Sequence, residues 1–186
     1  MTTKTYAALL RGINVSGHKK VPMAELRTLI EGLGHGAVRT HLNSGNAVFS
    51  TESAASDDSL AHDLQAAISK HFGFTVDCLV RDGAYLRAVA EACPFPAAEL
   101  EGKQLHANFY SGSFDEARFA GLDRASYLPE EFRLGDRVLY LYAPDGLGRS
   151  KLGEALSRPA LNKGLTVTGR NWNTVVKLVE LTAATA

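Results

Sequence analysis

The sequence predicts an α+β protein built from two consecutive units with the same element order, strand–helix–strand–strand–helix–strand. Short apolar runs of strand length alternate with longer stretches in which apolar residues recur at helical spacing. In each half, two strand-like runs flank a short turn that contains glycine, which is typical of a β-hairpin. The element order repeats while the letters do not, so an internal duplication is a hypothesis at this point.

In the first half, residues that start or stop helices set the element boundaries. Pro22 stands at the first turn of one helix, and Ser56 can cap a second one. Gly34 and Gly73 follow the last apolar positions of these helices and end them. In order, we expect a strand at 6–10, a helix from Pro22 to Gly34, a hairpin over 37–51 that turns at Asn43-Ser44-Gly45-Asn46, a helix from Ser56 to Gly73, and a strand at 75–80.

The second half begins after a helix at 84–92, which Pro94 and Pro96 terminate. The same signals then predict a strand at 105–110, a short helix at 115–122, a hairpin of strands 130–134 and 137–142, a helix capped by Ser150 that carries Leu152, Leu156 and Leu161, a strand at 165–168, and a last helix capped by Asn171. We interpret residues 1–82 as one ferredoxin-like unit, 83–102 as a connecting helix and linker, and 103–186 as a second such unit with a C-terminal helix.

Composition and charge narrow the class of protein. Among 186 residues, 20 basic and 20 acidic side chains cancel, so no overall positive field draws the chain to nucleic acid. The N-terminus lacks the pattern of a signal peptide, and no apolar stretch is long enough to span a bilayer. Cys78 and Cys93 fit neither a metal spacing nor a disulfide framework. We therefore expect a cytoplasmic protein without membrane contact, metal or cofactor.

Five stretches resemble a known family. They are YAALLRGINVSG (6–17), MAELRTLIEGLG (23–34), VRTHLNSGNAVF (38–49), GRSKL (148–152) and RNWNTVVKL (170–178). The chain resembles the bacterial family catalogued as domain of unknown function 1697, and the resemblance spans both halves. It implies an α+β protein of two ferredoxin-like subdomains, with no established activity and no catalytic residues. His18 and His41 stand where the family usually has other residues.

The loop after the first strand is one candidate binding site. It reads RGINVSGHKKVP from Arg11 to Pro22 and joins a strand to a helix, the setting of many phosphate-binding loops. Its residues match neither the Walker pattern nor the dinucleotide pattern. A crossover loop whose glycines permit unusual backbone angles is the alternative interpretation. The candidate ligand residues in this loop are Arg11, Asn14 and Lys20.

A second candidate lies near the C-terminus, where basic residues outnumber acidic ones. Between Leu147 and Leu178, only Glu154 opposes Arg149, Lys151, Arg158, Lys163, Arg170 and Lys177. Lys151 flanks one predicted helix start, and Arg170 and Asn173 flank the next, so an anion could bind there. A solvated basic face is the alternative. Trp172 can anchor the last helix in a core or provide a stacking surface.

These residues favour a non-hydrolytic protein that binds a phosphate-bearing small molecule, such as a nucleotide. The predicted ligand residues are Arg11, Asn14, Lys20, Lys151, Arg170 and Asn173, and no catalytic residue is assigned. RNA binding in the RRM manner is disfavoured, because Asn46 and Val48 stand where stacking aromatics belong. A nucleic-acid accessory protein with a local basic face and a protein-interaction module remain as alternatives. The oligomeric state, and whether the two sets of residues meet, stay open.

Overall fold

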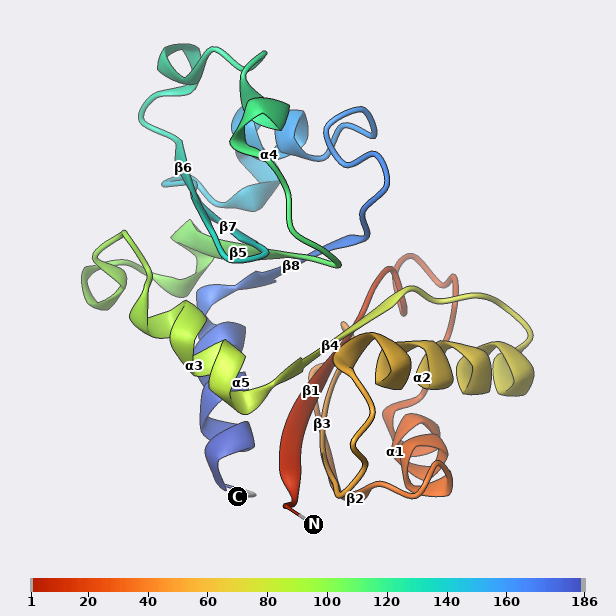
Figure 1. The fold of residues 1–186 in the computed structure, drawn as a ribbon. Helices are drawn as coiled ribbons and strands as arrows, with labels where there is room; N and C mark the ends of the chain where they lie inside the picture. The colour runs from red at the N-terminus through yellow and green to blue at the C-terminus, as the bar shows by residue number, and fades with distance from the viewer. Residues whose placement is uncertain (1, 185–186) are drawn as a thin grey trace. The chain divides into compact units, whose positions relative to one another are not determined.

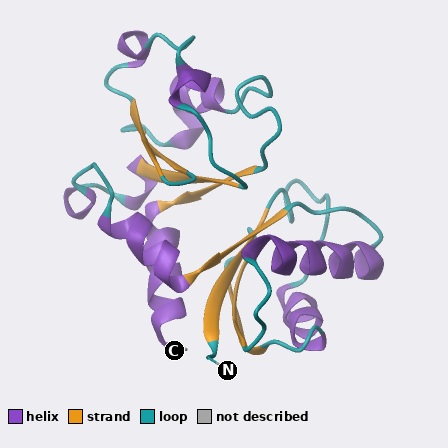
Figure 2. Ribbon diagram, viewed as in Figure 1, coloured by secondary structure: helices purple, strands orange, loops and turns teal. Residues whose placement is uncertain are grey.

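The computed structural model describes residues 2–184 and contains two four-stranded antiparallel sheets. Their strand orders are β2-β3-β1-β4 and β6-β7-β5-β8 (Figures 1 and 2). The chain divides into two compact units, one made of residues up to Arg87 and from Leu178 onward, the other of Ala88–Lys177. Each unit holds one sheet with the strand order of a ferredoxin-like fold, which confirms the predicted α+β class. Within the described range, no helix has the length and apolar character needed to cross a membrane.

The first unit follows the predicted order. Its elements are β1 (Lys4–Leu10), α1 (Met23–Gly32), β2 (Gly36–His41), β3 (Asn46–Thr51), α2 (Asp57–Phe72), β4 (Cys78–Asp82) and the start of α3 (Gly83–Glu91). The Ser56 hydroxyl accepts a hydrogen bond from the Ser59 amide (3.2 Å), and Gly73 ends α2 in the left-handed conformation. The predicted caps of α2 are therefore confirmed.

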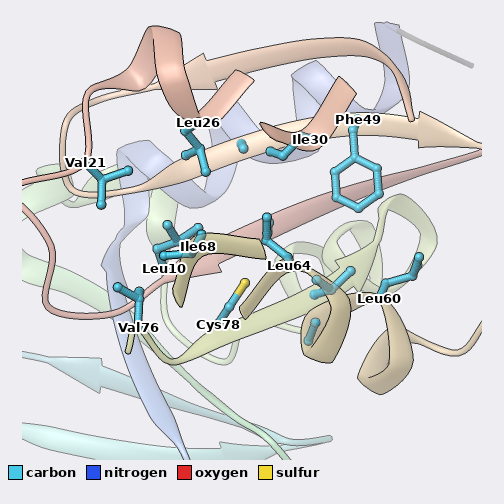
Figure 3. Close-up of a cluster of buried hydrophobic side chains, with 14 of the residues drawn as sticks. Leu10, Val21, Leu26, Ile30, Phe49, Leu60, Leu64, Ile68, Val76 and Cys78 are labelled. Atoms are coloured by element: carbon cyan, nitrogen blue, oxygen red, sulfur yellow. The ribbon is translucent and has the colours of Figure 1, made fainter. Parts of the chain in front are cut away.

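The core of the first unit lies between its sheet and the two helices α1 and α2, which cover the same face (Figure 1). Alternate residues of β1 point into this layer, because successive side chains of a strand point to opposite faces. Figure 3 shows Leu10 of β1 among Ile68 of α2 and the β4-side residues Val76 and Cys78. Each such buried side chain contributes about 1.5–3 kcal/mol relative to an exposed one.

The second unit has the same strand order, but a 3₁₀ turn and a six-residue helix follow its first and third strands, where the first unit has α1 and α2. Its elements are the end of α3, η1 (Ala97–Glu99), η2 (Gly102–Gln104), β5 (Leu105–Tyr110), η3 (Glu116–Phe119), η4 (Arg124–Tyr127), β6 (Glu131–Gly135), β7 (Val138–Tyr142), η5 (Leu147–Arg149), α4 (Lys151–Leu156), β8 (Val167–Asn171) and the first part of α5 (Trp172–Ala184), up to Lys177. The helix predicted at 115–122 is instead a single short 3₁₀ helix, η3, and a second one, η4, follows beyond the predicted range. Helix α4 stops before Leu161, because Pro159 cannot continue a helix and disfavours it at the preceding residue.

Candidate functional site

Three segments of the first unit meet at the end of β1 where the strand leaves the sheet. They are the loop 11–22, the turn 42–45 between β2 and β3, and residues 73–77 before β4. Their contacts span long stretches of sequence: Asn14 Nδ2 donates to the carbonyl of Asn43 (2.7 Å), Lys19 Nζ donates to the carbonyl of Thr75 (2.8 Å), and Arg11 pairs with Asp77 (3.7 Å). Residues 11–20, 42–45 and 73–77 together are referred to as the β1-end surface.

The loop itself is a miniature hairpin. The Asn14 amide donates to the carbonyl of Lys19 (3.1 Å), and the His18 amide donates to the carbonyl of Val15 (2.9 Å). The two tip residues, Ser16 and Gly17, have φ values of 50° and 76°, as in a type I′ turn. The tip is exposed to solvent. A two-residue hairpin of this kind differs from the long glycine-rich loop that wraps a phosphate in P-loop proteins.

The Asn14 side chain holds this hairpin in place. Its Oδ1 accepts a hydrogen bond from the Val21 amide (2.9 Å), while Nδ2 donates to the carbonyls of Val21 (3.0 Å) and Asn43 (2.7 Å). Both N–H groups of the amide are thus used within the protein. Asn14 therefore positions the loop, and any ligand contact would have to come from the remaining lone pair of Oδ1.

The β1-end surface also concentrates backbone conformations that side chains disfavour. Six non-glycine residues among 2–184 have positive φ, and four of them lie here: Asn14, Ser16, Lys19 and Leu42. Each left-handed residue costs roughly 1–2 kcal/mol, so the surrounding contacts must impose the shape. Such strain clusters at functional sites.

Two predicted ligand residues of this surface face solvent. The Arg11 side chain is 58% exposed and forms its ion pair with Asp77 at 3.7 Å, a long and exposed contact. Lys20 is exposed and forms no ion pair or hydrogen bond within residues 2–184. Both cations can therefore reach an anion in solution at little cost to the fold.

The second predicted set lies in the other unit, at the starts of α4 and α5. Lys151 is exposed as the first residue of α4. The backbone donors beside it are already bonded, since the Gly153 amide donates to Ser150 Oγ (2.8 Å) and the Leu152 amide donates to Glu130 Oε2 (2.8 Å). An anion at this helix start would compete with the Glu130 carboxylate.

Arg170 and Asn173 flank the start of α5. Arg170 is buried in β8 and donates to Thr168 Oγ1 (2.8 Å) and to the carbonyl of Gly169 (2.9 Å). Asn173 is exposed, and its amide packs so closely on Gly102 that no Cβ would fit there. These contacts give both residues a structural role in the second unit, and their part in binding stays a prediction. Trp172 is buried, with its ring centroid 6.2 Å from that of Tyr140, as expected of a core anchor.

The second unit also contains an apolar hollow that no sequence motif predicts. A hollow of about 260 Å³ lies beside β6, with Leu128, Phe132 and Leu152 in its lining and charged side chains at its rim. These residues come from β6, α4 and the segment between η4 and β6, so no local motif announces them.

Comparison with known proteins supports the fold and names a family. No curated protein matches the sequence. A solved structure described as a conserved bacterial protein, SP0830 from Streptococcus pneumoniae, is similar over 97% of this chain and 99% of its own, with 25% identity and a TM-score of 0.77. The sequence matches a family described as Protein of unknown function (DUF1697) over residues 3–140, and the chain belongs to that family.

Proposed function

We propose that the β1-end surface binds a small anionic molecule that bears a phosphate group, such as a nucleotide, without hydrolysing it. The observation that supports this most strongly is the clustering of left-handed non-glycine residues around two exposed cations, Arg11 and Lys20. Strain that the fold maintains at an exposed, basic surface has no evident use in stability.

The residues of this surface would have different roles. The Arg11 guanidinium would exchange its long contact with Asp77 for two parallel hydrogen bonds to phosphate oxygens. Lys20 would add a second positive charge from the other side of the hairpin. Asn14 would hold the loop in shape through Val21 and Asn43. Lys151, Arg170 and Asn173 belong to the second unit, and their part in binding stays a prediction.

Isothermal titration of the full chain with inorganic phosphate, AMP, ATP and single-stranded oligonucleotide tests the proposal. We expect saturable binding of a phosphate-bearing small molecule, weakened about tenfold or more by Arg11→Gln and by Lys20→Gln, because each removes one charge-assisted contact. Lys4→Gln is the matched control, since Lys4 is an exposed lysine at the opposite end of β1. Absence of binding, or equal losses with Lys4→Gln, would overturn the proposal.

The same titration examines the second set of residues. If Lys151→Gln weakens binding as much as Lys20→Gln does, the second set of residues also takes part in binding. If Lys151→Gln leaves the affinity unchanged, the site is confined to the first unit.

A further inference from the structure

The hollow beside β6 lies in the second unit, and the proposed function does not use it. Its volume is about 260 Å³, and its apolar lining comes from Ala125, Leu128, Phe132 and Leu152. Leu128 is 62% exposed, a large apolar side chain left open to solvent at the mouth of an apolar hollow. Concave, apolar surfaces with a few polar groups at the rim are the usual form of small-molecule sites, and those for drug-sized ligands begin at about 300 Å³. This one therefore suits a smaller ligand.

Two arginines on the rim are held in fixed positions. The Arg124 guanidinium lies 3.9 Å from the centre of the Phe132 ring, and its NH1 donates to the Phe132 carbonyl (3.2 Å). Arg133 donates to the same carbonyl from its own NH1 (3.0 Å). A guanidinium that lies over an aromatic ring and is hydrogen-bonded to the backbone is held in position, so its remaining N–H groups can meet a carboxylate.

Their acidic partners are exposed and exchangeable. Arg124 NH2 lies 3.6 Å from Glu116, whose side chain is 79% exposed, and Arg133 NH2 lies 3.2 Å from Glu131. Exposed pairs of this kind contribute little to stability, typically 0–1 kcal/mol. A ligand carboxylate can therefore replace Glu116 on Arg124 without disturbing the fold.

Glu130 supplies the opposite charge on the same rim. Its Oε2 accepts a hydrogen bond from the Leu152 amide (2.8 Å), which fixes the carboxylate at the edge of the hollow. Its Oε1 has no hydrogen-bond partner among residues 2–184. The hollow thus combines an apolar floor with a fixed cation and a fixed anion.

We propose that this hollow binds a small apolar amino acid as its zwitterion. The ligand carboxylate pairs with Arg124, and its ammonium group donates to Glu130 Oε1. Its side chain packs on the exposed Leu128 and Ala125, above the buried Phe132 and Leu152. The balance of signs on the rim, Arg124 and Arg133 against Glu130 and Glu131, favours a zwitterion over a simple acid or amine. This site is independent of the proposed function of the first unit.

An extended peptide added to the edge strand β6 is a poorer fit to the same region. The outward carbonyl of Phe132 already accepts hydrogen bonds from both Arg124 and Arg133. Strand addition needs that carbonyl for its own ladder, so the arginines block the edge.

Isothermal titration of the full chain with L-leucine and L-phenylalanine tests the assignment. Three analogues each lack one feature: leucinamide has no carboxylate, N-acetylleucine has no ammonium group, and serine has no apolar side chain. We expect saturable binding of leucine or phenylalanine, and a loss of about tenfold or more for each analogue, because leucinamide and N-acetylleucine each lose a charge-assisted hydrogen bond and serine loses the apolar contact. No binding of either amino acid, or equal affinity for N-acetylleucine, would overturn it.

Two variants locate the binding within the molecule. Leu128→Ser should weaken leucine binding while leaving the fold intact, because Leu128 is mostly exposed. Leu147→Ser is its matched control, because Leu147 is a leucine of the same unit that is 51% exposed and does not line the hollow. Arg124→Lys should also weaken binding, since lysine keeps the charge but loses the planar fork. Equal effects of Leu128→Ser and Leu147→Ser would contradict the assignment.

Discussion

At the end of β1 in the first unit and of β5 in the second, the same two backbone hydrogen bonds close the sheet. In the first unit, Leu10 donates to Gly45 (2.8 Å) and Arg11 donates to Asp77 (2.9 Å). In the second, Tyr110 donates to Arg137 and Ser111 donates to Thr166, both at 2.9 Å. The scaffolds thus agree at this point. What differs is the chain that leaves the strand: a strained basic hairpin in the first unit, and a short path to η3 in the second.

The residue at the neighbouring turn shows how the first unit accommodates its hairpin. Gly45 and Arg137 occupy equivalent positions, and both have positive φ, 99° and 54°. A Cβ at Gly45 would lie 2.8 Å from both Leu10 Cβ and Ile13 Cδ1, because Ile13 is buried beneath the turn. The second unit tolerates an arginine at this position. The comparison indicates that the close contact between Ile13 and Gly45 helps to hold the hairpin in place.

Other positions support a common origin of the two units. Ala7 of β1 pairs with Arg81, and Ala107 of β5 pairs with Arg170, each arginine being buried in the last strand of its sheet. The residue after each arginine then starts a helix: Asp82 accepts from the Tyr85 amide (2.7 Å), and Asn171 from the Thr174 amide (3.0 Å). Register and capping therefore repeat in the two units, and the paired alanine and arginine are the same residue types in both, which supports the duplication hypothesis.

The largest effect should come from Gly45→Ala. The new methyl group meets Leu10 and Ile13 and forces a left-handed alanine, so we expect a loss of about 2–5 kcal/mol from strain and overpacking together. Arg137→Gly, the reverse kind of change at the equivalent position of the second unit, should alter stability by less than about 1 kcal/mol. Urea unfolding followed by circular dichroism measures both. Similar losses at the two positions would break the comparison.

Asn14→Ala should have the next largest effect. It removes three hydrogen bonds and leaves the Val21 amide without its acceptor, which costs about 1–3 kcal/mol. Where the chain leaves β5 in the second unit, one side-chain hydrogen bond is made instead, from the Thr166 amide to Ser111 Oγ (2.9 Å). Ser111→Ala should therefore destabilise less in the same unfolding measurement. A loss below about 0.5 kcal/mol for Asn14→Ala would show that Asn14 does not hold the hairpin.

Some of these contacts could be predicted from the sequence, and others could not. Ser56, Ser150 and Asn171 were recognisable as caps, because a cap bonds to a backbone amide only a few residues away. The Asn14–Asn43 contact joins residues 29 positions apart, and nothing in either segment announces it. At the start of α4, the sequence predicted an anion site but gave no sign that the Glu130 carboxylate accepts a hydrogen bond from the Leu152 amide. The two residues are 22 positions apart. Helix caps were predictable because they are local. The hydrogen bonds between distant segments, which determine the partners of Asn14 and Glu130, were not.

A smaller effect should appear with pH, through one histidine in each unit. Burial lowers the pKa of His35, against an opposing effect of Asp63, and lowers the pKa of His106, against its hydrogen bond to the Lys103 carbonyl. Between each lowered pKa and the ordinary value of about 6.5, the unfolded chain binds more protons than the folded one. The free energy of unfolding should therefore be greatest above that value and fall as the pH drops below it.

Urea unfolding at pH 7.5 and pH 5 measures this loss. His35→Gln and His106→Gln should each reduce the difference between the two pH values. His62→Gln is the control, because His62 is exposed on α2. If His62→Gln changes the difference in unfolding free energy between the two pH values as much as His35→Gln and His106→Gln do, burial of these histidines does not cause the loss of stability at low pH.

Arg11→Gln should change stability least of all, by less than about 0.5 kcal/mol, because its ion pair with Asp77 is long and solvent-exposed. The same substitution is expected to weaken phosphate binding about tenfold or more. Ser111→Arg, which places an arginine at the equivalent point of the second unit, should create no such binding, since that unit has no left-handed hairpin beside it. Urea unfolding and isothermal titration of these two variants show whether phosphate binding depends on the arginine charge alone or also on the shape of the hairpin. If Ser111→Arg binds phosphate as well as the first unit does, the charge alone is sufficient, and the strained hairpin must have another role.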